Sequence, residues 1–166
     1  CHNDVVACHD DWLKFLFDKV DKQGYSVCGF VKDNQRMNAI HISGLLTKTK
    51  IAKAVSMFPV YDSYTGKQIA DVGDLLTGHC RNNDLKYFCC RNTHNDEDLQ
   101  GICKAPFDGL YFVDRALNDR DEVIFLHLGR GTPKTFGSYH KANRLNLRGW
   151  VDFVEDNILN VEKKQV

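Results

Sequence analysis

Long apolar runs are missing from this 166-residue sequence, and so is any excess of charge of one sign. No stretch approaches the roughly 20 apolar residues that a membrane-spanning helix needs, so we expect no membrane partner. The 22 Lys and Arg residues balance the 22 Asp and Glu residues. A balanced chain lacks the electrostatic footprint of a dedicated duplex-binding protein, although a local basic patch remains compatible with it.

Proline is scarce as well, with 3 residues, and the sequence has neither a fixed-period repeat nor a Pro- or Ser-rich linker. We therefore expect one domain over residues 1–166, with any seam near residues 99–107. The chain begins at Cys1 without Met and without a secretory signal pattern. This start favours a processed or excised piece of a longer product.

Cysteine is abundant, but no CxxC pair is present. An odd count of seven leaves at least one thiol unpaired if the others form disulfides, which favours a reducing compartment. Cys89 and Cys90 are neighbours on an expected strand, so their side chains point to opposite faces and one zinc ion could use only one of them. We expect no cofactor. The alternative is a zinc site with ligands from His79, Cys80, Cys89 or Cys90, His94 and Cys103.

The N-terminal part of the chain predicts one helix followed by a hairpin. Residues 9–24 place Asp10 or Asp11 at the N-cap, apolar residues at helical spacing, and Gly24 after the end. Residues 25–31 and 37–46 are apolar and flank the polar turn KDNQ, which predicts two paired strands.

Residues 58–91 hold the densest turn, cysteine and aromatic signals. They predict a strand that ends in the turn Thr65-Gly66-Lys67, a short connecting segment, and a strand that carries Cys89 and Cys90.

Two more strands are expected over residues 109–117 and 121–129. Residues 145–159 mix strand and helix signals, with Gly149 favouring a strand at their start. Strands that follow one another through short turns, after one long N-terminal helix, predict an α+β fold. Its sheet would be mostly antiparallel and barrel-like.

Two histidine motifs suggest a first kind of catalysis. His41-Ile42-Ser43 and His127-Leu128-Gly129 resemble the paired His-x-Ser/Thr motifs of two-histidine phosphoesterases. In those enzymes, the histidines act as general acid and base on a phosphodiester. The second motif has Gly129 in place of the hydroxyl residue, so ordinary strand histidines are the competing interpretation.

Cysteine-based catalysis has less support. His79-Cys80 is followed by Lys86 where a phosphatase loop would have Arg, and the loop lacks a phosphate-wrapping glycine. No thiol lies at a recognisable helix N-terminus or elbow, so a cysteine protease is unsupported.

A basic and aromatic cluster lies in residues 130–148. Such a segment can follow a phosphate backbone while its rings stack on bases, and a solvated loop is the simpler interpretation. Its members are Lys134, Phe136, Tyr139, His140, Lys141, Arg144 and Arg148.

Several segments together resemble the N-terminal nonstructural proteins of coronaviruses, namely the leader protein and the start of the second protein. The segments YSVCGFV, AIHISGLL and LKYFCCR follow the helix in the order of that family, and FDGLYFV and LNLRGWVDF are similar to alphacoronavirus leader strands. The signature residues of this resemblance are Val60, Tyr61, Asp62, Tyr64, Gly66 and Lys67.

The resemblance implies a viral nonstructural protein, cleaved from a polyprotein, with a barrel-like fold and no enzymatic activity. It further implies action in the host cell cytoplasm, where host proteins or the translation machinery would be bound and host gene expression or innate responses suppressed. RNA is an alternative partner. The contact surface would combine the basic and aromatic cluster with Tyr61, Tyr64 and Lys67.

Two rival functions remain open. One is a two-histidine phosphoesterase that uses His41 and His127 on an RNA or oligonucleotide phosphodiester. The other is a Toll/interleukin-receptor-like signalling module, which would require a parallel sheet with alternating helices.

Overall fold

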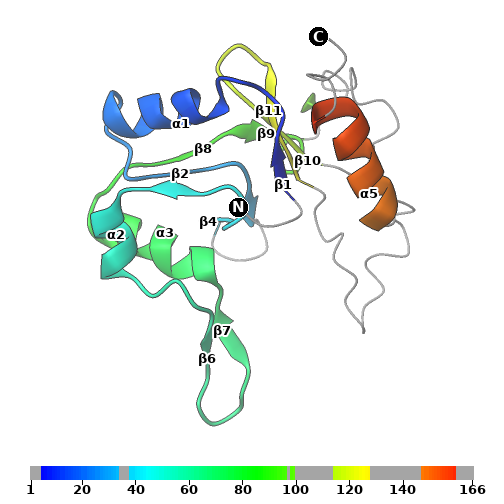
Figure 1. Ribbon diagram of the computed structural model, residues 1–166. Helices are drawn as coiled ribbons and strands as arrows, with labels where there is room; N and C mark the ends of the chain where they lie inside the picture. Colours follow the sequence, from blue (N-terminus) through cyan, green and yellow to red (C-terminus); the bar gives the residue numbers. More distant parts are fainter. Residues whose placement is uncertain (1–4, 34–37, 97, 100–113, 128–146, 160–166) are drawn as a thin grey trace.

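The computed structural model describes residues 5–33, 38–96, 98–99, 114–127 and 147–159 (Figure 1). Four short helices lie in these ranges: α1 (Trp12–Asp21), α2 (Thr49–Ala54), α3 (Val72–Asn82) and α5 (Leu147–Val154), the last continuing as a π-helical turn over Glu155–Leu159. The strands are β1 (Val5–Ala7), β2 (Val27–Gly29), β3 (Lys32–Asp33), β4 (Ala39–Ile40), β5 (Leu46–Thr47), β6 (Val60–Tyr61), β7 (Gln68–Ala70), β8 (Tyr87–Cys89), β9 (Arg91–Asn92), β10 (Asp114–Leu117) and β11 (Val123–His127).

The strands form four small sheets. The largest has the order β1-β11-β10-β9 and is antiparallel throughout. The second has the order β5-β2-β8, in which β2 runs antiparallel to β5 and parallel to β8. β3 pairs with β4, and β6 pairs with β7, each antiparallel. The hairpin expected from residues 25–31 and 37–46 is met only in part: β2 pairs antiparallel with β5, but β3 lies within the expected turn KDNQ and pairs with β4.

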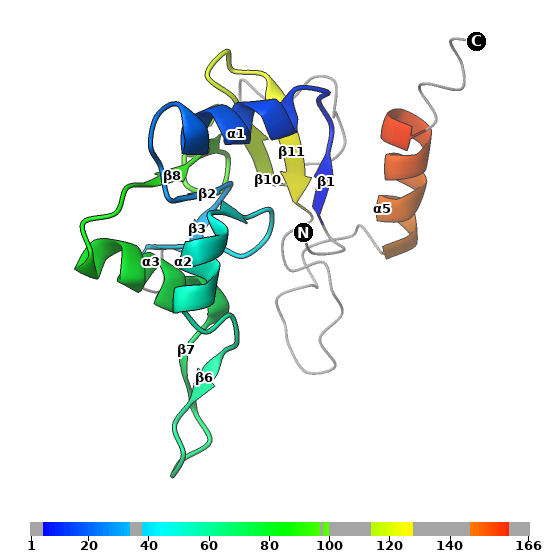
Figure 2. The ribbon, with the colours of Figure 1, turned by 60° about the vertical axis from the view of Figure 1, so that its left-hand side comes forward.

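The core lies where the two larger sheets meet under α1 (Figures 1 and 2). The rings of Phe30, just after β2, and Phe125, on β11, stack with their centroids 3.8 Å apart. Trp12 of α1 meets Phe125 edge-on at 5.2 Å, and Leu16 is buried against the same cluster. One apolar cluster therefore joins both sheets to the inner face of α1.

The α+β class and the mostly antiparallel pairing agree with the sequence, but the barrel and the long N-terminal helix were wrong. α1 has 10 residues, about 15 Å of helix, and it ends at Asp21 before the chain reverses through Gly24 at φ +75°. The described strands have two to five residues each and are divided among separate sheets, so they do not close on one another.

Two of the helices, α2 and α3, were not expected, and α5 forms where the sequence mixes strand and helix signals. Residues 72–82 form α3 rather than a short connection, and Asp74 accepts a hydrogen bond from the backbone N–H of Asp71 at 2.8 Å, which caps its first turn. Gly73 permits this helix to approach β4, since a Cβ there would lie 1.9 Å from the Ile40 carbonyl oxygen. The strand expected from Gly149 is the helix α5, and α2 lies in a segment for which no element was expected.

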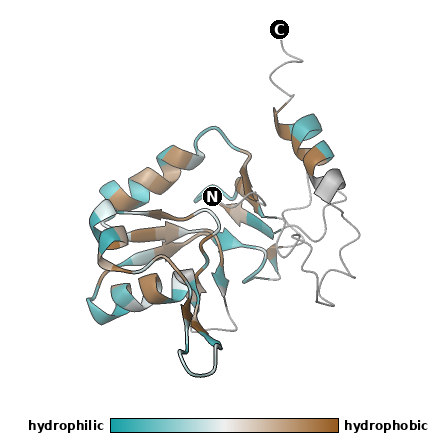
Figure 3. Ribbon diagram, turned by 60° about the horizontal axis from the view of Figure 1, so that its bottom comes forward, coloured by the Kyte–Doolittle hydropathy of each residue, from teal (hydrophilic) through white to brown (hydrophobic). Residues whose placement is uncertain are grey.

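A hairpin projects from the body of the molecule below α2 and α3 (Figures 1 and 2). We call residues 58–70 the arm; it contains β6, β7 and the turn between them. The Asp62 carboxylate accepts hydrogen bonds from Tyr64 N, Thr65 N and Thr65 Oγ1 at 3.0, 2.7 and 2.8 Å. Gly66, at φ +66°, closes the turn expected from sequence. In Figure 3, the tip of the arm is hydrophilic, whereas hydrophobic residues colour the strands of the body.

None of the helices in the described ranges is long and apolar enough to cross a membrane. The expected seam near residues 99–107 lies almost entirely outside these ranges.

Candidate functional site

The structure brings together the two histidines that the sequence singled out. His41 follows β4 and His127 ends β11, yet their ring centroids are 5.7 Å apart. The two residues come from different sheets and from distant parts of the chain. The paired-histidine hypothesis requires the two rings to lie close together, and they do. Gly129 of the second motif lies outside the described residues.

A chain of hydrogen bonds runs through His127. Its Nδ1 lies 3.3 Å from Asp114 Oδ2, and its Nε2 lies 3.3 Å from Ser43 Oγ. An ionised carboxylate can only accept, so Nδ1 carries the proton that faces Asp114. In a neutral ring the Ser43 hydroxyl donates to Nε2, and in a protonated ring Nε2 donates to the hydroxyl oxygen. Ser43 is fully buried and His127 is 8% exposed. The arrangement of Ser43, His127 and Asp114 resembles the nucleophile, general base and carboxylate of a serine hydrolase. The Ser43 hydroxyl, however, is not accessible to solvent.

Asp114 is the charged centre of this cluster. Its second oxygen, Oδ1, lies 3.7 Å from Nδ1 of His94. Burial alone would raise the pKa of Asp114, but the hydrogen bonds from His127 and His94 outweigh it and lower the pKa to about 2. The carboxylate is therefore ionised at neutral pH and holds both imidazoles in place.

Sequence reasoning missed Asp114, although a signal for it existed. β10 and β11 are joined by a short turn, and in their register Asp114 lies directly opposite His127. A β-bulge between Ala116 and Leu117 shifts that register. A register derived from the turn by pairing residues one by one would therefore not place Asp114 opposite His127.

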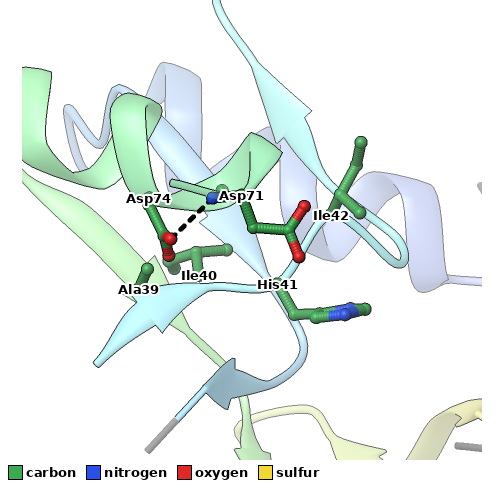
Figure 4. A pocket seen from close by; sticks show the side chains of 7 residues that line it. Ala39, Ile40, His41, Ile42, Asp71 and Asp74 are labelled. Atoms are coloured by element: carbon green, nitrogen blue, oxygen red, sulfur yellow. Dashed lines mark hydrogen bonds between the residues drawn. The ribbon is translucent and has the colours of Figure 1, made fainter. Parts of the chain in front are cut away.

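The space beside His41 is small. It is lined by Ala39, Ile40, His41, Ile42, Asp71, Gly73 and Asp74, and its volume is about 10 Å³. In Figure 4, the side chains of Asp71 and His41 lie on the same side of the pocket. About 10 Å³ is the lower limit for one water molecule. The His41 imidazole could exchange a proton with a water there, but a phosphodiester does not fit in this conformation.

A larger hollow, of about 150 Å³, lies between α1 and the turn from β10 to β11. Its charged side chains are already paired: Lys14 with Asp18 at 2.8 Å, Arg120 with Asp11 at 3.6 Å, and Asp119 with Lys19 of α1 at 2.6 Å. These charges already neutralise each other, so the hollow offers little to a charged ligand.

The alternative zinc ligands do not converge. His79 and Cys80 lie on α3, Cys89 on β8, and His94 beside Asp114, whereas Cys103 lies outside the described ranges. Among the described residues, no group of three or more His, Cys, Asp or Glu side chains could hold a metal ion.

The described thiols are poor nucleophiles. Burial raises the pKa of Cys80, which packs in the core with Val27 and Leu76. Burial also raises the pKa of Cys28 to about 12 and that of Cys89 to about 11. The described thiols are therefore protonated at neutral pH, which disfavours the phosphatase-loop and cysteine-protease interpretations.

The expected contact surface is described in part. Tyr61, Tyr64 and Lys67 are exposed residues of the arm, with Tyr64 at 97% exposure. Arg148 lies in α5. The other members of the basic and aromatic cluster, Lys134, Phe136, Tyr139, His140, Lys141 and Arg144, fall outside the described residues.

No protein-family model matches this chain, and neither a curated protein nor a solved structure was found that matches it.

Proposed function

We propose that this protein acts by binding a partner through the arm, and not by catalysis. The observation that carries this proposal is the exposure of three aromatic rings on one projecting hairpin. Phe58 is 76% exposed, Tyr61 57% and Tyr64 97%. Aromatic residues are enriched in the centres of binding interfaces, where they bury large areas on association.

The rest of the described molecule supports binding over catalysis. His41 lines a pocket of only about 10 Å³, and Ser43, next to His127, is fully buried. The arm, in contrast, stands clear of the body, so a partner could approach it from several sides (Figure 2).

The finer proposal concerns the consequence of binding. Following the resemblance to coronavirus N-terminal nonstructural proteins, the partner is a host component, and its capture lowers host gene expression, translation or innate responses in the cytoplasm. Of the signature residues of that resemblance, Val60 and Tyr61 form β6, and Asp62, Tyr64, Gly66 and Lys67 lie in the turn of the arm that follows.

A reporter assay tests this proposal. Wild-type protein expressed in cells is expected to lower the output of a co-expressed reporter, and the double variant Tyr61→Ala/Tyr64→Ala should lose most of this effect. The reason is that both rings are exposed and serve no core packing, so their removal weakens binding but not folding. Phe17→Ala is the matched control, because Phe17 is also 57% exposed but lies on α1.

Two results would count against the proposal. One is a wild-type protein that leaves the reporter unchanged at an expression level comparable to that of the control. The other is an equal loss of effect in Phe17→Ala and in the arm variant.

The meeting of His41 and His127 favours a second candidate, the two-histidine phosphoesterase. If it is correct, purified protein should hydrolyse a short RNA oligonucleotide, and His41→Ala or His127→Ala should each reduce turnover by about 10²–10⁴-fold. His79→Ala is the control, since His79 lies on α3 outside the cluster. Absence of turnover above a buffer blank in the wild-type protein would eliminate this candidate.

The Toll/interleukin-receptor-like signalling module is not supported by the fold. It would require a parallel sheet, and the parallel pairing in the described sheets is limited to β2 and β8.

A further inference from the structure

The segment from α2 to the end of the arm is basic within a chain of zero net charge. Residues 48–70 contain four lysines, Lys48, Lys50, Lys53 and Lys67, and one acidic residue, Asp62. Lys50, Lys53 and Lys67 are exposed. Within the part of the chain that the structure describes, none of these three forms an ion pair. Their charges are therefore available to an anionic partner.

The one carboxylate of this segment is already engaged. Asp62 accepts hydrogen bonds from the backbone of Thr65 and Tyr64 and from the Thr65 hydroxyl, and these bonds lower its pKa. Its role is to hold the turn that presents Tyr64 and Lys67. The carboxylate is thus a structural element of the tip and is not directed at a ligand.

Three aromatic residues lie between Lys53 and Lys67 of the same segment. Lys53 precedes Phe58, and Tyr61 and Tyr64 precede Lys67. None of the three rings contacts another aromatic ring within the described residues. α2 ends at Ala54, only a few residues before the arm, and both views place it beside the base of the arm (Figures 1 and 2). The cations of α2 and the rings of the arm therefore occupy one end of the molecule.

From this arrangement, and resting on the proposed function, we infer that the partner bound by α2 and the arm is a single-stranded nucleic acid. Lysines neutralise the phosphates, and each exposed ring stacks on an unpaired base. A duplex hides its base faces, so it could use the lysines alone, whereas a single strand presents phosphates to the lysines and unpaired bases to the rings at the same time. The combination of free cations and free rings thus favours a single strand.

Fluorescence anisotropy with a labelled oligouridine tests this inference on the full chain. The wild-type protein is expected to bind at low salt, and Tyr64→Ala should weaken binding roughly tenfold through lost stacking. Lys50→Gln/Lys53→Gln should weaken binding and reduce its salt dependence, which for three or four phosphate contacts has a log–log slope of roughly 2–3. Phe17→Ala and Lys22→Gln, exposed changes on or next to α1, should leave binding unchanged.

The inference is overturned if oligouridine does not bind at low salt, if a duplex of equal length binds as tightly, or if the α1 variants weaken binding as much as the arm variants do. A deoxy oligonucleotide of matched sequence distinguishes RNA from DNA, since equal affinity would mean that the 2′-hydroxyl is not read. If the arm variants abolish the reporter effect while no oligonucleotide binds, the proposed function stands with a protein partner and this inference fails.

Discussion

Replacing Phe30 by Ala is expected to lower the free energy of unfolding by about 3–5 kcal/mol, the range for a large aromatic residue in a closed core. Phe30 is 1% exposed, and its ring stacks on Phe125 across the junction of the two larger sheets. The ring also lies against Gly44, where a Cβ atom would come within 1.3 Å of it. The neighbouring backbone is therefore fitted to the ring, and its removal should leave a cavity.

Urea denaturation followed by circular dichroism measures this loss. Phe17→Ala provides the matched control, because it removes the same side chain from an exposed position and should change stability by less than about 1 kcal/mol. A loss for Phe30→Ala no greater than that of Phe17→Ala would show that the two sheets do not depend on this contact.

The second large effect is expected at Asp114. Asp114→Ala should lower the free energy of unfolding by about 2–3 kcal/mol at neutral pH, because it leaves the Nδ1–H of the buried His127 without its acceptor. The effect should depend on pH. The folded-state pKa of about 2 lies below the ordinary value of 3.8, so the carboxylate stabilises the fold above pH 3.8, and this contribution is lost as the pH falls toward 2.

Urea titrations of wild type and variant at several pH values between 2 and 7 check this expectation. Asp114→Asn keeps the shape and one acceptor, so it should retain part of the stability while losing the pH-dependent part. Asp10→Asn, at an exposed position, is the control for a general loss of negative charge. A difference between wild type and Asp114→Ala that is constant over the whole pH range would contradict the assignment.

Local signals in the sequence predict the structure correctly where one residue type determines a conformation. Gly66 takes the positive φ that the turn of the arm needs. Asp11 lies at the expected N-cap position of α1, but its side chain makes no capping hydrogen bond. The hypothesis that His41 and His127 act as a pair agrees with their proximity in space.

Other parts could not be inferred, because their causes are tertiary. Gly73 lies in a segment expected to be a short connection, but it permits close packing of α3 on Ile40, and that contact is visible only in three dimensions. Gly149 favours a strand in sequence terms, yet it lies inside α5. The barrel was wrong because it assumed that each strand pairs with its neighbour in sequence, whereas β2 pairs with β8 and β1 with β11. Asp114 escaped notice because a bulge displaces its register.

The pairing of β1 with β11 also determines when this protein can fold. Val5 lies opposite His127, so the first described strand has no partner in its sheet until nearly all of the described chain has left the ribosome. Closing so long a loop is entropically costly, and such distant contacts slow folding. β1 therefore cannot take its place in this sheet before β11 has been translated. In a nascent chain that stalls before Val123, β11 is missing, so β1 has no partner strand in this sheet and is available to chaperones.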